Sequence, residues 1–177
     1  GATKLSNEIS AASIFKGSKV KVRGLRYFSV YGPMGRPDMA YFKLFLCAAR
    51  NKKFSLFGDG NVQRDFTFID DVVSCTIKLL DQARHEPGYV NDVVNVGGGN
   101  PMSMNELISV IESISGKRIE IMKLPGNDSD SRITKADTKL QNNLIAQAPN
   151  VELVDGIRET HLWFTQVLKN DFMLGIK

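Results

Sequence analysis

The amino-acid sequence predicts an α/β fold with an incomplete sheet. Segments rich in β-branched and aromatic residues alternate with amphipathic segments of about ten residues, as strands alternate with helices in α/β proteins. The clearest strand is Val20 to Tyr31, which ends at the turn signal Gly32-Pro33. A second strand, Val93 to Val96, enters a glycine-rich loop. Two central parallel strands are too few for a stable doubly wound sheet, so we expect more sheet than this chain supplies.

The opening residues have the spacing of a helix. Leu5, Ile9, Ala12 and Ile14 recur at near-helical intervals, and no capping residue precedes Gly1, so we expect a helix whose first turn lies upstream. Further helices are expected at about 38–52, 72–82, 104–115, 135–145 and 154–168, and further strands at 54–57, 64–69 and 119–124.

Several helix starts have recognisable signals. Asp38 is placed to cap the helix that follows it, and Asp70 and Asp71 put negative charge at the next helix start, where the helix dipole favours it. Ser103 and Glu106 have the spacing of a capping box.

Composition excludes several classes of function. The chain has 177 residues, 42% of them hydrophobic, and a net charge of +4 from 23 basic and 19 acidic residues. No apolar run approaches the roughly 20 residues of a membrane span, and no secretory leader opens the chain. The basic residues are scattered, which argues against nucleic acid and leaves a solvated surface or an anionic ligand. Cys47 and Cys75 lie in apolar segments, which predicts reduced thiols and a cytoplasmic protein.

Several motifs resemble, in order and over nearly the whole chain, those of extended short-chain dehydrogenase/reductase enzymes. They are Gly1-Ala2-Thr3-Lys4, Leu25 to Pro33, Gly35 to Ala40, Gln63 to Asp71, Val94 to Gly97 and Gly156 to Thr160. Within that family the segment GRPDMA (residues 35–40) is similar to UDP-glucuronate 4-epimerases.

The resemblance implies a division of the chain. Residues 1–33 would be the last helix and strand of an NAD-binding Rossmann-type domain, and residues 34–177 a small mixed α/β substrate-binding region, with 70–100 returning to the Rossmann sheet. It also implies bound NAD, a UDP-sugar substrate and a homodimer in the full-length parent.

The resemblance assigns roles to residues near the cofactor. Lys4 would lower the pKa of the family's catalytic tyrosine and hold the nicotinamide ribose, although a lysine at this position in isolation reads as a solvated helix residue. Tyr27 and Phe28 would lie beside the nicotinamide; strand packing is the alternative for both and fully accounts for Phe28. Ser29 would contact the sugar or a phosphate; many relatives carry Asn there.

Three arginines are candidates for the substrate. Arg36 would bind a substrate carboxylate, and its alternative is a surface loop residue. Arg64 would bind the UDP diphosphate, and its alternative is an ion pair with Asp65. Arg132 would contact the nucleotide ribose or phosphate, although the stretch Gly126-Asn127-Asp128 departs from the family pattern just before it.

Two parts of the family's machinery are missing from the sequence. The catalytic tyrosine would lie one residue before Gly1, and Gly97 to Gly99 lacks the G-x-G-x-x-G spacing that seats a dinucleotide, so we read it as an ordinary loop. We therefore expect no epimerase activity from this chain alone, and self-association through exposed Leu5 and Ile9. A nucleotide-sugar 4,6-dehydratase or decarboxylase, or a non-catalytic nucleotide-sugar-binding remnant, are the alternative functions.

Overall fold

The computed structural model describes residues 1–87, 90–126, 130–146 and 149–169. In chain order the elements are α1 (Ala2–Ile14), β1 (Val22–Tyr27), β2 (Ser29–Tyr31), α2 (Ala40–Arg50), β3 (Phe54–Phe57), β4 (Gln63–Phe68), α3 (Ile69–His85), β5 (Asn91–Val96), β6 (Pro101–Ser103), α4 (Met104–Ser115), β7 (Ile121–Leu124), β8 (Ile133–Thr134), α5 (Lys139–Leu144) and α6 (Leu153–Lys169). The α/β class predicted from the sequence is confirmed.

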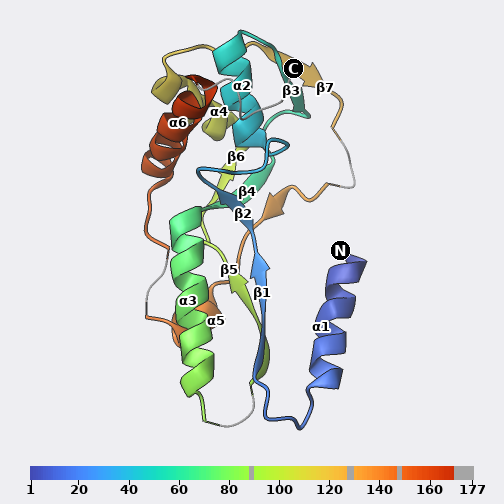
Figure 1. Ribbon diagram of the computed structural model, residues 1–177. Coiled ribbons are helices and arrows are strands. Elements are labelled where there is room, and N and C mark those ends of the chain that lie inside the picture. Colours follow the sequence, from blue (N-terminus) through green and yellow to red (C-terminus); the bar gives the residue numbers. More distant parts are fainter. Residues whose placement is uncertain (88–89, 127–129, 147–148, 170–177) are drawn as a thin grey trace.

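The molecule is elongated and has two lobes (Figure 1). In the sheet lobe, β1 and β5 pair in parallel, with α3 and α5 beside them. In the helical lobe, α2 packs on α4 and on β3 of the parallel pair β3–β7, and α6 packs on α4 and β4, on the side away from that pair (Figure 1). Strand β4 lies between the lobes, parallel to β2 and β8 and antiparallel to β6.

The predicted strand from Val20 to Tyr31 is two strands in two sheets. Tyr27 is the last residue paired with β5, and Ser29 is the first paired with β4. At the junction the Phe28 N–H still donates to the Val96 carbonyl (3.3 Å), while its own carbonyl accepts from the Val30 N–H (2.9 Å). This tight turn of the backbone moves the chain from one lobe to the other.

Each lobe has its own hydrophobic core. In the helical lobe the inward face of α2 contributes Tyr41, Phe42, Leu44, Phe45 and Ala48, at the i, i+3, i+4 spacing of an amphipathic helix. Phe164 of α6 packs edge-on against Phe42 with ring centroids 5.4 Å apart. In the sheet lobe, buried side chains of α3 pack on Val94 and Val96 of β5.

Tyr31 lies fully inside the helical core, 2% exposed, and its hydroxyl has no hydrogen-bond partner among the described residues. Burial, followed by the nearby carboxylate of Asp71, raises the pKa of Tyr31. Gly156 of α6 allows this packing, because a Cβ atom there would lie 2.2 Å from the Tyr31 hydroxyl oxygen.

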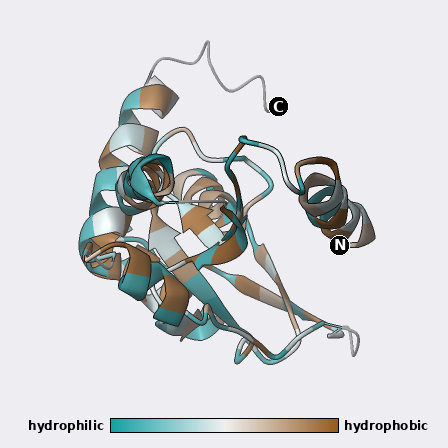
Figure 2. Ribbon diagram, turned by 90° about the horizontal axis from the view of Figure 1, so that it is seen from below, coloured by the Kyte–Doolittle hydropathy of each residue, from teal (hydrophilic) through white to brown (hydrophobic). Residues whose placement is uncertain are grey.

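Helix α1 stands apart from the rest of the molecule. None of its residues is buried, and Leu5, Ile9 and Ile14 are 53%, 62% and 72% exposed. Seen along the long axis of the molecule, α1 lies to one side and carries hydrophobic segments (Figure 2). The exposure expected for Leu5 and Ile9 is confirmed; the self-association expected from it stays a prediction.

Some predicted boundaries were wrong for physical reasons. Asp38 does not cap α2, because its carboxylate pairs with Arg36 and the cap position is Met39. Helix α5 begins at Lys139 rather than near residue 135, because the Ala136 N–H donates to the distant Asp65 carboxylate (2.9 Å). Asp70 and Asp71 do lie in the first turn of α3, as predicted, but the Asp71 carboxylate does not cap the helix and accepts from the N–H groups of Asn150 (3.1 Å) and Val151 (2.9 Å).

The predicted capping box of α4 is confirmed. The Ser103 hydroxyl accepts from the Glu106 N–H (3.2 Å), and the Glu106 carboxylate accepts from the Ser103 N–H (2.8 Å).

We predict that Ser103→Ala lowers the free energy of unfolding by about 1 kcal/mol, since the Glu106 N–H then loses its acceptor. Urea unfolding measures this, with Ser109→Ala on the same helix as control. Equal losses for both variants would contradict a specific role for the cap.

Candidate functional site

Arg64 of β4 is held in a fixed orientation facing the hollow beside β3. Its Nη1 donates to the carbonyl oxygens of Gln63 (2.9 Å) and Ser131 (2.8 Å), and its Nη2 lies 3.2 Å from the Asp130 carboxylate. The side chain is 21% exposed. Asp65, the alternative ion-pair partner considered above, accepts from backbone N–H groups instead of pairing with Arg64. The guanidinium is therefore oriented in advance for an anion.

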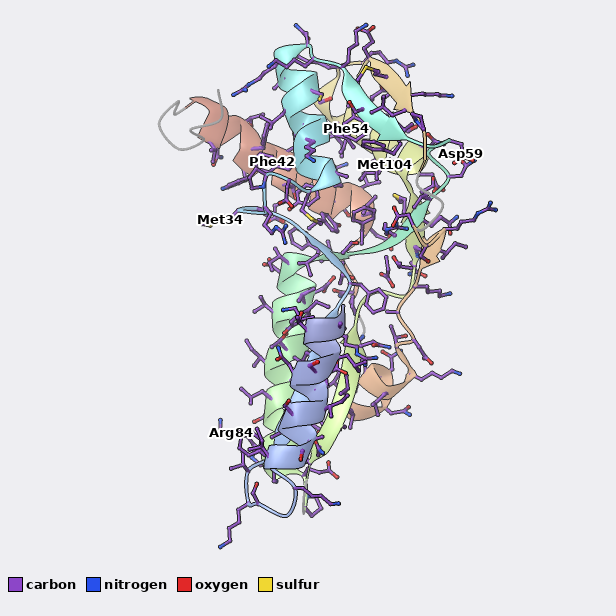
Figure 3. All side chains as sticks on the ribbon, turned by 90° about the vertical axis from the view of Figure 1, so that its right-hand side faces the viewer. Met34, Phe42, Phe54, Asp59, Arg84 and Met104 are labelled. Atoms are coloured by element: carbon purple, nitrogen blue, oxygen red, sulfur yellow. The ribbon has the colours of Figure 1, made fainter. Side chains whose placement is uncertain are left out.

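The hollow beside Arg64 has the size of a small-molecule site. It encloses about 580 Å³ between α2 and β3, within the usual range for ligand pockets. Phe54 and Met104 line it, and both project into the same region in Figure 3. Its charged lining is Lys43, Arg50, Lys52, Lys53 and Arg64 against Asp38 and Asp130. This excess of positive charge favours an anionic ligand.

Arg132 lines a neighbouring hollow of about 820 Å³, formed with Gly58 and Asp59 of the turn after β3. Asp130 lines both hollows and so lies at their boundary. The turn is rigid: Asp59 accepts from the Asn61 N–H (2.9 Å) and from its side-chain amide (2.9 Å), and Asn105 of α4 donates to the Asp59 carbonyl (3.1 Å). Arg64 and Arg132 thus flank adjoining spaces.

The glycine loop after β5 binds a carboxylate of the protein itself. Gly98 N–H donates to Asp65 Oδ1 (3.2 Å), and Gly99 N–H donates to Asp65 Oδ2 (2.9 Å). Gly97 is required by close packing, because a Cβ there would lie 2.7 Å from that of Ala136. These N–H groups are occupied, so the loop is not open to a phosphate.

Lys4, Tyr27 and Phe28 lie around the carboxyl ends of β1 and β5. Helix α1 runs antiparallel to β1, which brings its first turn, with Lys4, level with the end of that strand (Figure 1). The pairing is fixed by Glu8, one turn after Lys4, whose carboxylate accepts from Arg26 Nε (2.8 Å) and Nη2 (2.6 Å). Ligands of open α/β sheets bind at such strand ends, which makes this end of the sheet a candidate ligand region.

The three residues at the junction of β1 and β2 differ in their exposure and contacts. Tyr27 is 48% exposed, and its hydroxyl lies 3.1 Å from that of Thr76 on α3. Phe28 is half-buried and lines a hollow of about 360 Å³ together with Arg36. Ser29, also half-buried, begins β2.

Arg36 lies in the loop between β2 and α2, on the surface. Its Nε donates to the Asp38 carboxylate at 2.9 Å, and a second contact joins Nη2 to the same group. Arg36 lines the hollow with Phe28 and not the one with Arg64. Arg64 and Arg132 therefore line adjoining hollows, and Phe28 and Arg36 line a third, separate one.

Sequence reasoning missed three residues of this region. The sequence analysis did not single out Lys43 or Asp130, and it considered Asp65 only as a partner for Arg64. Lys43 carried a signal: it is the cation facing out from an otherwise apolar helix segment. Asp130 follows an insertion-like stretch and carried none.

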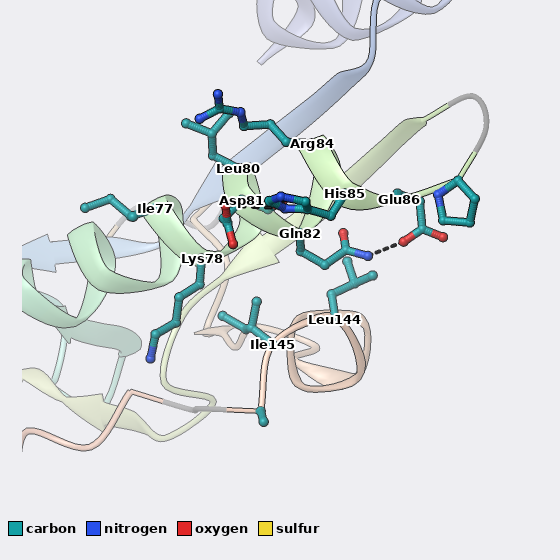
Figure 4. A pocket seen from close by; sticks show the side chains of 12 residues that line it. Ile77, Lys78, Leu80, Asp81, Gln82, Arg84, His85, Glu86, Leu144 and Ile145 are labelled. Atoms are coloured by element: carbon teal, nitrogen blue, oxygen red, sulfur yellow. Dashed lines mark hydrogen bonds and ion pairs between the residues drawn. The ribbon is translucent and has the colours of Figure 1, made fainter.

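A larger hollow lies at the opposite end of the molecule, between the end of α3 and α5 (Figure 4). It encloses about 900 Å³ and is lined by Leu80, Leu144 and Ile145 among others. Its polar groups contact one another: Asp81 pairs with His85 (3.4 Å), and the Gln82 amide donates to Glu86. Its described lining balances Lys78 and Arg84 against Asp81 and Glu86, so no excess of one charge favours an ionic ligand, and we favour the Arg64 region despite its smaller volume.

Two classes of site find no support in the part of the chain that the structure describes. No group of three or more His, Cys, Asp or Glu side chains there could hold a metal ion. None of the helices in those residues combines the length and apolar character needed to cross a bilayer.

Residues 1–97 match the NAD dependent epimerase/dehydratase family. The UDP-glucuronate 4-epimerase of Thermodesulfobacterium geofontis is 34% identical over 163 residues, which is 92% of this chain and 49% of that protein. The chain belongs to the NAD-dependent epimerase/dehydratase family. The resemblance read from the motifs is confirmed.

Solved structures agree with the family assignment. A mutant of the UDP-glucuronic acid 4-epimerase from Bacillus cereus, in complex with UDP-4-deoxy-4-fluoro-glucuronic acid and NAD, is 34% identical, with a TM-score of 0.85 over 94% of this chain and 52% of that one. UDP-glucose 4-epimerase from Thermotoga maritima, with UDP-glucose, is 28% identical, with a TM-score of 0.84 over 95% and 53%. The chain thus spans about half the length of the family members it matches.

The turn at Asp59 makes a prediction about pH. The Asn61 N–H, then the Asn61 amide, hold the pKa of Asp59 below its ordinary value of 3.8. The folded chain therefore favours the carboxylate, and its contribution to stability is complete above about pH 4 and is lost as the pH falls through the lowered pKa. We expect Asp59→Asn to lower the melting temperature at pH 6 and the difference to shrink below about pH 4. A difference that stays constant down to pH 2 would contradict this.

Proposed function

We propose that this chain is the substrate-binding part of an NAD-dependent UDP-hexuronate 4-epimerase, which interconverts UDP-glucuronate and UDP-galacturonate through a transient 4-keto sugar. The observation that carries the proposal is the pre-oriented Arg64 guanidinium in a cationic hollow of ligand size. The family membership and the UDP-sugar and NAD complexes of the relatives support the same reading.

The proposed roles follow from what each side chain can do. Arg64 and Arg132 would bind the diphosphate, since planar guanidinium groups match phosphate oxygens. Arg36 would leave Asp38 to bind the hexuronate carboxylate, a swap that costs little because an exposed ion pair contributes little. Ser29 would hold the sugar at the strand end.

The residues at the ends of β1 and β5 fit NAD. Bound there, NAD supplies reversible hydride acceptance at the sugar C4. Lys4 would hold the nicotinamide ribose, and its positive charge would stabilise the phenolate of the family tyrosine expected four residues before it. Tyr27 and Phe28 would line the nicotinamide side of the site. The division at residue 33 between a cofactor-binding part and a substrate-binding region belongs to the same proposal.

Two further expectations accompany this function. Both cysteines are free thiols, Cys75 buried and Cys47 partly so, which supports a cytoplasmic location. The exposed apolar residues of α1 support a homodimer of the full-length protein.

Titration with UDP tests the substrate class. We expect the chain to bind UDP more tightly than uridine, and Arg64→Gln to weaken UDP binding by about tenfold or more, since a hydrogen bond to a charged group is lost. Arg118→Gln is the control variant. Arg118 forms an ion pair with Glu112, its side chain is 94% exposed, and it does not line the hollow that contains Arg64. Isothermal titration calorimetry at two salt concentrations gives both values. Equal effects of the two variants, or no UDP binding, would overturn the proposal.

Activity distinguishes the related functions. The 177 residues contain neither a tyrosine four positions before Lys4 nor a G-x-G-x-x-G loop, so we expect a polypeptide of these residues alone not to epimerise UDP-glucuronate. In a longer polypeptide that includes both features, formation of UDP-galacturonate is the expected product. A 4-keto-6-deoxy sugar or a released carbon dioxide would instead identify a dehydratase or a decarboxylase. UDP binding without NAD binding would identify the remnant.

A further inference from the structure

Asp65 is a buried carboxylate without a cation. It is 0% exposed, and no Lys or Arg among the described residues pairs with it. Three backbone N–H groups supply its hydrogen bonds: those of Gly98 (3.2 Å), Gly99 (2.9 Å) and Ala136 (2.9 Å). A buried charge is retained only where such donors compensate it fully, so its three partners are held firmly in place.

The three donors come from separate parts of the chain. Gly98 and Gly99 form the turn that leaves β5, and Ala136 follows β8. Asp65 itself lies in β4, next to Arg64. One side chain therefore joins the sheet lobe, the strand that carries Arg64, and the segment that carries Arg132.

The bond to Ala136 extends a very short strand pairing. Strand β8 has only two residues, with Gln63 opposite Ile133 and Arg64 opposite Thr134. At the start of this pairing the Gln63 N–H donates to the Arg132 carbonyl (2.8 Å). Beyond its end the Asp65 carboxylate accepts a hydrogen bond from the Ala136 N–H. The carboxylate thus closes the far end of the pairing. This matters because a slip of one residue would turn each side chain to the other face.

We infer that Asp65 is a positioning residue that sets the spacing between the Arg64 and Arg132 guanidinium groups, and through it the preference for a diphosphate over an uncharged nucleoside. This rests on the proposed function. Arg64 depends on the same register, because its Nη1 donates to the carbonyl of Ser131, next to Arg132. Asp65 touches no ligand in this scheme; it acts through the two arginines.

The test compares UDP with uridine, which lacks the diphosphate. We expect Asp65→Asn to raise the dissociation constant of UDP by about tenfold and that of uridine by less than about twofold. The amide keeps the shape of the carboxylate but turns an N–H donor toward backbone N–H groups. A general loss of structure would raise both constants together.

Asp71→Asn is the matched control. Asp71 is also a buried carboxylate that accepts from two backbone N–H groups, those of Asn150 and Val151, but it lies outside the Arg64–Arg132 pairing. We expect it to lower the melting temperature and leave the UDP-to-uridine ratio unchanged. If Asp65→Asn does not fold, Ala136→Pro deletes the N–H at the other end of the bond, and the same loss of preference for UDP is expected.

A double-mutant cycle tests whether Asp65 acts through the arginines. Asp65→Asn should weaken UDP binding much less in an Arg132→Gln background than in the wild type, because the spacing no longer matters once one arginine is gone. The inference would be overturned if the two substitutions multiplied the dissociation constant of UDP independently, or if Asp65→Asn left the ratio of the UDP and uridine dissociation constants unchanged. UDP binding that still depended on Arg64 would in that case keep the proposed function intact. Absence of UDP binding by the wild-type chain would overturn both.

Discussion

The fold depends on one stretch of chain that serves two sheets. From Val22 to Tyr27 it pairs with β5, and from Ser29 to Tyr31 it pairs with β4. A single residue, Phe28, separates these two pairings. Its N–H donates to the Val96 carbonyl of β5, and its carbonyl accepts from the Val30 N–H of β2. Because the lobes are joined here, the end of the β1–β5 pair lies next to the strand that carries Arg64. The proposed cofactor and substrate regions would thus be neighbours through backbone geometry.

Local signals in the sequence were reliable where neighbouring residues determine the structure. The capping box of α4 and the helix expected at about 38–52 depend on residues within a few turns, and both are present, the helix as α2. The junction at Phe28 could not be predicted, because Val20 to Tyr31 has uniform strand character and its two partners lie more than 30 residues away. Strands β6 and β8 were missed for the same reason: they are short, and they exist through pairing with β4.

The candidate site shows the same difference between features that nearby residues determine and features that distant residues determine. Arg64 was identified from its motif, yet its orientation depends on the carbonyl of Ser131, which is 67 residues away. Asp65 stands beside Arg64 in the sequence, and a charge pair between them was the alternative to diphosphate binding; the structure instead directs the Asp65 carboxylate to three backbone donors. Spacing along a chain indicates which residue types a site uses. It does not indicate which distant backbone groups hold them.

The contact between Tyr31 and Gly156 has a consequence for sequence variation. The ring and its hydroxyl fill the space that a side chain at position 156 would need. The hydroxyl itself makes no hydrogen bond among the described residues. Replacement of the tyrosine by phenylalanine would remove an unsatisfied polar atom, yet it would not make room at position 156, because the ring Cζ atom and Phe68 Cδ2 would each still lie 2.9 Å from a Cβ atom there. Position 156 should consequently remain glycine among homologues whether or not the hydroxyl at position 31 is present, although the two are 125 residues apart in the chain.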